Sequence, residues 1–425
     1  MSVSLCIHRA AREIGGNCIE LKIAADERIL LDAGLPLVHG GNVPSCDMDV
    51  ASIPFRAQAR GLVNGEQSSV PASLDIAQPV AGVLISHAHQ DHAGLLEALP
   101  KDWPVYCGKA TERLLQLGAA LGNTSLRQTC FHWESGKAIA IGSFIITPYL
   151  IDHSAFDAYM LRVDIEGKTI VYTGDFRAHG RKAKLTEAIM RNPPEYVDAL
   201  IMEGTNLTMD AAAKPAFTEA EIEEQFVRLF RECAGRVFVS WASTNIDRTV
   251  TLYRACKKSG RLLVLDLYCM LVLMRLKEFA RLPQPEWEDG VMRAVVTPKM
   301  MRLMDRLGEF ELIEYLKRHQ AAMSARKLEQ AQTAPGLVIM ARGGLVDDYR
   351  RKGVRPTEKD TWAWSMWDGY LEDESTLSMR EFFTPCQKIC IHTSGHASPA
   401  VLKRFAENHA GKKGDSRTWR ALGGI

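Results

Sequence analysis

Short apolar runs, separated by glycines and charged turns, dominate the first two hundred residues. They predict strands at 17–24, 28–32, 80–86, 105–107, 138–146, 159–165, 169–173 and 199–202, and helical spacing at 95–99. Residues 44–79 have no clear period and are rich in Pro, Ser, Ala and Gly, which predicts a long loop or lid. The first half of the chain is therefore expected to be a β-rich domain.

The pattern changes in the middle third of the chain. Apolar runs at 236–240, 262–266, 294–297 and 337–341 alternate with helix-like stretches at 218–233, 246–258, 268–280 and 312–318. This alternation predicts a mainly parallel α/β sheet in a second domain. Its first strand is not followed by GxGxxG, so a dinucleotide site is not supported. A strand at 388–396, which ends in a Ser-Gly-His turn, and a helix at 400–407 follow.

Composition adds little to this picture. At roughly 150 residues per domain, 425 residues suggest two or three domains, and 46% apolar with 24% charged residues is typical of soluble globular proteins. A net charge of +1 argues against a protein that coats nucleic acid nonspecifically. Residues 1–14 lack the apolar core of a signal peptide, and the apolar run at 262–276 contains Asp266 and Arg275. We therefore expect a cytoplasmic protein whose ten cysteines are reduced.

The segment Ser86-His87-Ala88-His89-Gln90-Asp91-His92 carries the strongest chemical signal. It places three imidazoles and a carboxylate between a predicted strand and a predicted helix. His87 and His89 project from one side of an extended segment, and the Asp91-His92 pair follows where the chain turns. Imidazole nitrogen and carboxylate oxygen suit zinc and manganese. A solvent-exposed polar loop is the alternative, but the strand–loop–helix context favours a metal site.

Three further residues follow predicted strands. His153 and Asp175 are each unremarkable alone, because a lone histidine is usually packed and an Asp after Thr-Gly usually forms a turn. Beside the histidine-rich loop, both become candidate ligands. Asp32, in Leu31-Asp32-Ala33-Gly34, is expected to orient a metal ligand by a hydrogen bond without contacting the metal itself.

The order of these residues resembles the metallo-β-lactamase superfamily. The phrases Asp152-His153-Ser154-Ala155 and Tyr172-Thr173-Gly174-Asp175-Phe176-Arg177 are similar to its β-CASP branch, which includes ribonuclease J and the endonuclease subunit of the cleavage and polyadenylation factor. The resemblance covers residues 5–405. It implies an α/β fold: a metallo-β-lactamase αββα sandwich at 1–205, an inserted parallel α/β (β-CASP) domain at 206–385, and a return to the first domain at 386–425 with an atypical tail.

The resemblance also implies roles for individual residues. His87, His89 and His153 would bind one metal, Asp91 and His92 a second, and Asp175 would bridge the two. Two Zn²⁺ per chain are expected, with Mn²⁺ as the alternative. Glu203 matches the acidic residue that follows in β-CASP enzymes, and His396 matches the histidine at the return from the insertion.

The implied reaction is metal-dependent hydrolysis of single-stranded RNA by a hydroxide activated between two metals, with Asp175 and Asp91 positioning it. His396, positioned by Glu203, would protonate the departing ribose oxygen; a structural histidine capping the Ser-Gly turn is the alternative. Contacts to the RNA backbone are expected from Ser243, Asn245, Arg248, Arg177 and Ser394. The first three lie in the segment 240–248, whose Ser, Thr and Asn residues also fit a plain helix cap, a role compatible with anion binding.

The sequence departs from the branch in one place. The branch carries a further histidine ligand some 20 to 30 residues after the Ser-Gly-His turn, but residues 408–420 are polar and glycine-rich, and His409 comes early. This departure would weaken the second metal. It raises two competing hypotheses: an RNA-binding protein with an impaired metal site, and a hydrolase of a small ester. The second hypothesis gives no role to Glu203, His396 or the α/β insertion. Exonuclease or endonuclease action, RNA or DNA preference, and a homodimer stay open.

Overall fold

The computed structural model describes residues 3–9, 15–23, 27–36, 47–49, 56–60, 70–207, 216–330 and 336–409. It divides into two compact units, one comprising Met1–Pro215 with Gly395–Ile425 and the other Ala216–Ser394. The loop expected at 44–79 lies partly outside the described residues, and the tail beyond His409 lies wholly outside them. No helix of the described segments is long and apolar enough to cross a membrane.

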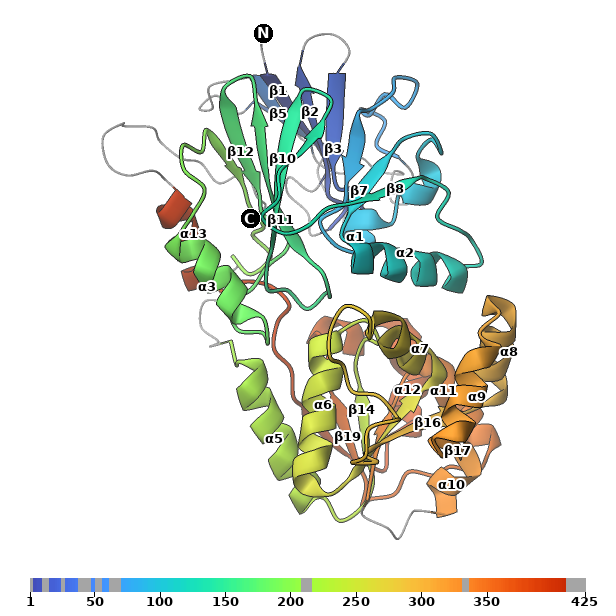
Figure 1. The fold of residues 1–425 in the computed structure, drawn as a ribbon. Helices are drawn as coiled ribbons and strands as arrows, with labels where there is room; N and C mark the ends of the chain where they lie inside the picture. The colour runs from blue at the N-terminus through green and yellow to red at the C-terminus, as the bar shows by residue number, and fades with distance from the viewer. Residues whose placement is uncertain are drawn as a thin grey trace. The chain divides into compact units, whose positions relative to one another are not determined.

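The first unit contains two β-sheets (Figure 1). The larger has the order β4-β5-β1-β2-β3-β6-β7-β8, and its strands are Asp47–Asp49, Arg56–Arg60, Val3–Arg9, Cys18–Ile23, Glu27–Leu31, Gly82–Leu84, Val105–Cys107 and Cys130–His132. The smaller has the order β13-β12-β11-β10-β9, and its strands are Ala199–Ile201, Lys168–Tyr172, Tyr159–Ile165, Phe144–Leu150 and Ile139–Ile141. Both sheets mix parallel and antiparallel pairs.

Three apolar layers hold these sheets between helices. Side chains such as Leu21 and Val163 fill the layer between the sheets. On the other face of the larger sheet, Val83 lies in one cluster with Leu115 of α2 (Lys109–Leu121) and with Ala93 of α1 (Gln90–Ala93). On the other face of the smaller sheet, Val171 and Leu200 share a cluster with residues of α3 (Ala183–Arg191) and α13 (Pro399–His409). Alternation of buried side chains on both sheet faces thus produces the expected αββα sandwich.

The second unit contains a seven-stranded sheet in which every neighbouring pair is parallel. Its order is β17-β16-β15-β18-β14-β19-β20, with strands Ala322–Ser324, Met292–Val296, Leu262–Asp266, Leu337–Met340, Val237–Ser240, Thr361–Trp364 and Gln387–Cys390. The helices are α5 (Glu219–Glu232), α6 (Ile246–Ser259), α7 (Leu267–Leu276), α8 (Pro298–Leu307), α9 (Phe310–Arg318), α10 (Ala325–Gln330), α11 (Gly343–Arg351) and α12 (Leu377–Phe382). The inserted parallel α/β domain is therefore confirmed.

Several details differ from the sequence-based expectations. The strand expected at 138–146 is two strands, because the chain turns at Gly142, whose φ is +57°. The segment expected as a loop at 44–79 contributes β4 and β5 to the larger sheet, where β5 pairs with β1. The strand expected at 388–396 is β20, which pairs with β19, so the second unit continues beyond residue 385 to Ser394.

Candidate metal centre

The histidine-rich loop follows β6 and is fixed by backbone hydrogen bonds to two distant segments. Asn17 N donates to Asp91 O over 2.9 Å, and Ala33 N donates to His92 O over 2.8 Å. A Cβ at Gly34 would lie 1.7 Å from Asp91 O, so only glycine permits this approach. The loop therefore takes its position from the chain around residues 17 and 34 as well as from its own strand.

Asp32 organises the loop from behind. Its backbone is left-handed, with φ +58°, and its carboxylate is fully buried. It accepts hydrogen bonds from Ser86 N at 2.7 Å, Ser86 Oγ at 2.7 Å and the Tyr172 hydroxyl, and it pairs with His92 Nδ1 at 2.6 Å. A carboxylate at Nδ1 holds the proton on that nitrogen and leaves the Nε2 lone pair of His92 for a cation. These contacts place the Asp32 carboxylate against His92, and the orienting role of Asp32 stays a prediction.

His87, His89 and His153 form the first candidate metal group. His89 Nδ1 lies 3.1 Å from His87 Nε2 and 3.2 Å from His153 Nε2. Two nitrogens on one tetrahedral zinc, each bonded at about 2.0–2.1 Å, would lie about 3.4 Å apart. Burial lowers the pKa of each of these three imidazoles, which keeps them neutral with lone pairs available. The donor set therefore fits a divalent cation.

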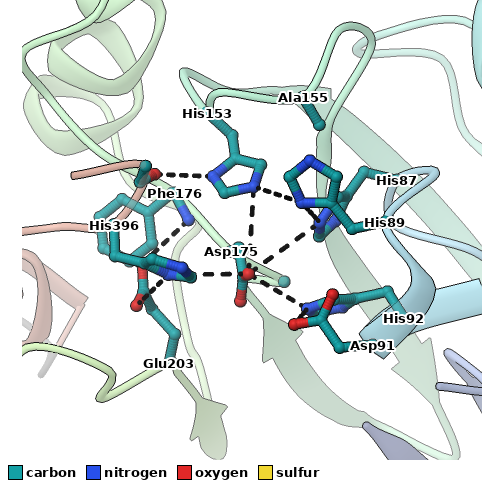
Figure 2. Close-up of polar contacts among 12 residues, drawn as sticks. His87, His89, Asp91, His92, His153, Ala155, Asp175, Phe176, Glu203 and His396 are labelled. Atoms are coloured by element: carbon teal, nitrogen blue, oxygen red, sulfur yellow. Dashed lines mark hydrogen bonds and ion pairs between the residues drawn. The ribbon is translucent and has the colours of Figure 1, made fainter. Parts of the chain in front are cut away.

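Asp175 lies at the centre of the site (Figure 2). Its Oδ2 is 3.2 Å from His92 Nε2 and 4.0 Å from both His87 Nε2 and His153 Nε2. Burial opposes ionisation, but His92 and His396 hold the pKa of Asp175 well below its usual range. His87, His92 and Asp175 form a second candidate group, so one carboxylate faces both groups. Asp91 lies farther out, with Oδ2 3.9 Å from His92 Nε2.

Glu203 and His396 form the third side of the site. His396 Nδ1 lies 3.0 Å from Glu203 Oε2 and 3.6 Å from Asp175 Oδ2. The other Glu203 oxygen accepts from Phe176 N and Ala397 N, which fixes Glu203 between the two chain segments. Burial opposes the charge on His396, but Glu203 and Asp175 raise its pKa to about 9. His396 can therefore carry a proton at neutral pH, and with Glu203 and Asp175 it also forms a third group able to hold a cation.

Comparison with known proteins identifies the family. The profile described as "Beta-lactamase superfamily domain" matches residues 27–255, more than half of the 425-residue chain. The chain belongs to the metallo-β-lactamase superfamily. It therefore has the hydrolase fold of this superfamily together with a candidate metal site rich in histidine and aspartate.

Curated relatives within this superfamily are named ribonuclease J. The relative from Thermus thermophilus is 25% identical over 416 residues, which cover 92% of this chain and 64% of the relative. The relative from Helicobacter pylori is 27% identical over 245 residues, which cover 56% and 32%. The chain thus spans less than two thirds of the length of these relatives. A crystal structure of a protein of unknown function from Enterococcus faecalis has the same fold, with TM-score 0.67 and 19% identity over 96% of this chain and 92% of that one.

The residues expected to contact substrate do not all have accessible side chains. Arg248 is fully buried and donates to Glu219 at 3.0 Å, and Arg177 is fully buried 3.6 Å from Asp152. We therefore assign both arginines structural roles. Ser243 is buried and accepts a hydrogen bond from Arg342 at 3.0 Å. Asn245 caps α6 by accepting from Arg248 N, and Ser394 is half-buried.

Sequence reasoning missed three residues that shape the metal site of this metallo-β-lactamase fold. Gly395 O lies 2.7 Å from His153 Nδ1 and orients that imidazole, and a Cβ at Gly395 would lie 2.6 Å from Ser154 Oγ. The Tyr172 hydroxyl, on the smaller sheet, donates a hydrogen bond to Asp32 Oδ2 at the end of a strand of the larger sheet. Lys182 donates to His153 O over 3.0 Å. The Ser-Gly-His motif was a signal for Gly395, and Tyr172 stands in the phrase that resembles the β-CASP branch, whereas nothing local indicated the contact of Lys182 with His153 O.

Proposed function

We propose that this chain is a metal-dependent phosphodiesterase that hydrolyses single-stranded RNA. The observation that carries the proposal is the position of Asp175 Oδ2, which lies 3.2–4.0 Å from imidazole nitrogens of His87, His92, His153 and His396. One carboxylate oxygen shared by two potential cation groups and a polarised histidine suits displacement at phosphorus. RNA is proposed as the substrate because the curated relatives are named ribonuclease J.

Each side chain has a defined task in this proposal. When bound, two divalent cations would lower the pKa of water and polarise the phosphate. His87, His89 and His153 would hold one cation, and His92 with Asp91 would hold the other beside Asp175. Asp32 fixes His92 through Nδ1, so that Nε2 is the nitrogen directed at Asp175 and available to the second cation.

His396 supplies the proton for the leaving ribose oxygen in this scheme. Glu203 holds its Nδ1 at 3.0 Å, and 24% of the His396 side chain is exposed. A partly accessible imidazole with one nitrogen fixed by a carboxylate is arranged as a general acid. His396 also belongs to the third candidate metal group, so metal binding is the alternative role of this side chain. The metal content of a His396 variant distinguishes metal binding from proton donation.

Ser243, Asn245 and Ser394 remain proposed contacts to the RNA backbone. The N-terminus of α6, which Asn245 caps, presents backbone N–H groups that suit a phosphate. Removal of these side chains is expected to raise KM while turnover at saturating RNA changes little. Arg248 and Arg177 are left out because their guanidinium groups are buried.

The test is cleavage of 5′-labelled single-stranded RNA by protein loaded with Zn²⁺ or Mn²⁺. We expect cleavage by the loaded chain and its loss after chelation. Substrates with 5′-monophosphate and 5′-triphosphate ends distinguish exonucleolytic from internal cutting. A protein that carries two ions, retains RNA and leaves it intact would contradict the proposal, as would cleavage of a small ester only.

The His396→Ala variant tests the acid assignment on the same substrate. We expect turnover to fall by about 10²- to 10⁴-fold with both ions retained, the usual contribution of a general acid. His132→Ala is the matched control, because His132 is an exposed histidine that pairs with Glu112. Loss of an ion in His396→Ala would assign His396 to metal binding, and unchanged turnover would remove the acid role.

A further inference from the structure

Asn17 lies in a tight turn directly beside the histidine-rich loop. Gly16, which precedes it, has φ +78°, and a Cβ there would lie 3.1 Å from Pro36 Cα. The backbone of Asn17 is fixed on both sides, because its N–H donates to Asp91 O at 2.9 Å and its carbonyl accepts from Gly34 N at 2.8 Å. The turn therefore presents the Asn17 side chain to the loop in a defined position.

The carboxamide of Asn17 lies next to the metal-facing nitrogen of His92. Asn17 Nδ2 is 3.1 Å from His92 Nε2 and 3.4 Å from Asp91 O. His92 Nδ1 is held by Asp32, so Nε2 is the nitrogen that faces Asn17. The same nitrogen lies 3.2 Å from Asp175 Oδ2. A cation bound to Nε2 beside Asp175 would repel the N–H groups of Asn17 from this position.

We propose that the Asn17 carboxamide turns on cation binding and presents Oδ1 as a ligand of the second cation, beside Asp91, His92 and Asp175. Rotation about the last side-chain bond exchanges Oδ1 and Nδ2 with little change of shape. It would place an oxygen about 3.1 Å from His92 Nε2. Atoms bonded to one ion at about 2.0–2.2 Å are separated by about 3.0–3.5 Å. This inference rests on the second cation of the proposed function.

The two cation sites would then differ in chemistry. The first is built from the imidazoles of His87, His89 and His153, and the second would take oxygen from Asn17 and two aspartates with one imidazole. Imidazole suits zinc, whereas carboxylate and amide oxygens suit harder ions such as Mn²⁺. The chain is therefore expected to bind one Zn²⁺ tightly and to accept Mn²⁺ at the second site.

The test uses the full chain stripped of metal and then titrated with one equivalent of Zn²⁺ followed by Mn²⁺. Calorimetry and elemental analysis report affinity and stoichiometry. We expect Asn17→Ala to keep the first ion and to weaken the second by about 10- to 100-fold, the range seen for groups that support a metal shell. Asn408→Ala is the matched control, since the Asn408 amide donates to Met190 O in the same unit. Equal affinity for the second ion in Asn17→Ala and wild type would overturn the proposal.

A direct readout separates ligation from simple support of the loop. In protein labelled with ¹³C at asparagine carboxamides, electron–nuclear double resonance on the bound Mn²⁺ should show a ¹³C coupling that Asn17→Ala abolishes and Asn408→Ala retains. A wild-type chain without that coupling would overturn the assignment. Two ions with the coupling but no RNA cleavage would refute the proposed function and leave the role of Asn17 intact.

Discussion

Replacement of Asp32 by asparagine separates the charge of this side chain from its shape. Asparagine is one of the few residues that readily adopts the left-handed backbone found at Asp32, where φ is +58°, so the substitution adds little backbone strain. The two side chains also have nearly equal volume, and the site is fully buried. The measured change therefore reports on hydrogen bonding and charge.

The expected magnitude follows from the donors around the carboxylate. Ser86 N points at Oδ1, whereas Ser86 Oγ, His92 Nδ1 and the Tyr172 hydroxyl converge on Oδ2. An asparagine keeps only one acceptor oxygen, which best serves the three groups at Oδ2. Ser86 N then faces an NH₂ group, and a buried donor without an acceptor costs about 1–3 kcal/mol. We expect the free energy of unfolding to fall by about 1–3 kcal/mol.

Urea unfolding of the metal-free protein, followed by hydrogen exchange of peptides that contain β3 and β6, measures this change in the first unit. Affinity for the second cation should fall by about 10- to 100-fold in the same variant, because Asp32 orients His92. Asp102→Asn, at an exposed aspartate, is the control. Wild-type stability together with wild-type metal affinity in Asp32→Asn would refute the reasoning.

Three further predictions concern packing, protonation and metal removal. Gly34→Ala would place a Cβ 1.7 Å from Asp91 O, so the loop must move, and elemental analysis should find the second ion lost; two retained ions would contradict this. Burial opposes a charge on His8, but Cys6 and Glu20 raise its pKa from 6.5 to about 9. Protonated His8 therefore adds to the free energy of unfolding, fully below pH 6.5 and no longer once the pH has risen through about 9. Between these two pH values, the free energy of unfolding of His8→Gln, measured in urea, should change less with pH than that of the wild type. Chelation should lower the thermal midpoint, because an ion at 100 times its Kd stabilises the fold by about 2.7 kcal/mol; an unchanged midpoint would oppose this.

Local sequence was informative where chemistry and secondary structure coincide. His87, His89 and His92 follow an apolar strand within six residues, and His153 and Asp175 each follow another strand. Loops at strand ends are common places for functional groups, so the convergence of these side chains was predictable. The parallel sheet of the second unit was also predictable, because its strands are continuous apolar runs between amphipathic helices.

The remaining features depend on partners that are distant in sequence. From its position at a helix start, Arg248 is predicted to contact substrate. Its burial against Glu219, a residue 29 positions earlier, becomes evident only in the folded structure. Asp47–Asp49 and Arg56–Arg60 are short, and their only apolar residues are Met48, Ala57 and Ala59, so little in the sequence indicated that they pair as strands. Asn17 looks like an ordinary turn residue after two glycines until His92 is placed beside it.

Anomalous diffraction from crystals of the zinc-loaded chain tests the central claim most directly. The account predicts two peaks on either side of Asp175, one bonded to His87, His89 and His153 and the other to His92. Peaks at other residues, or none near Asp175, would contradict the assignment of these side chains to a shared metal centre.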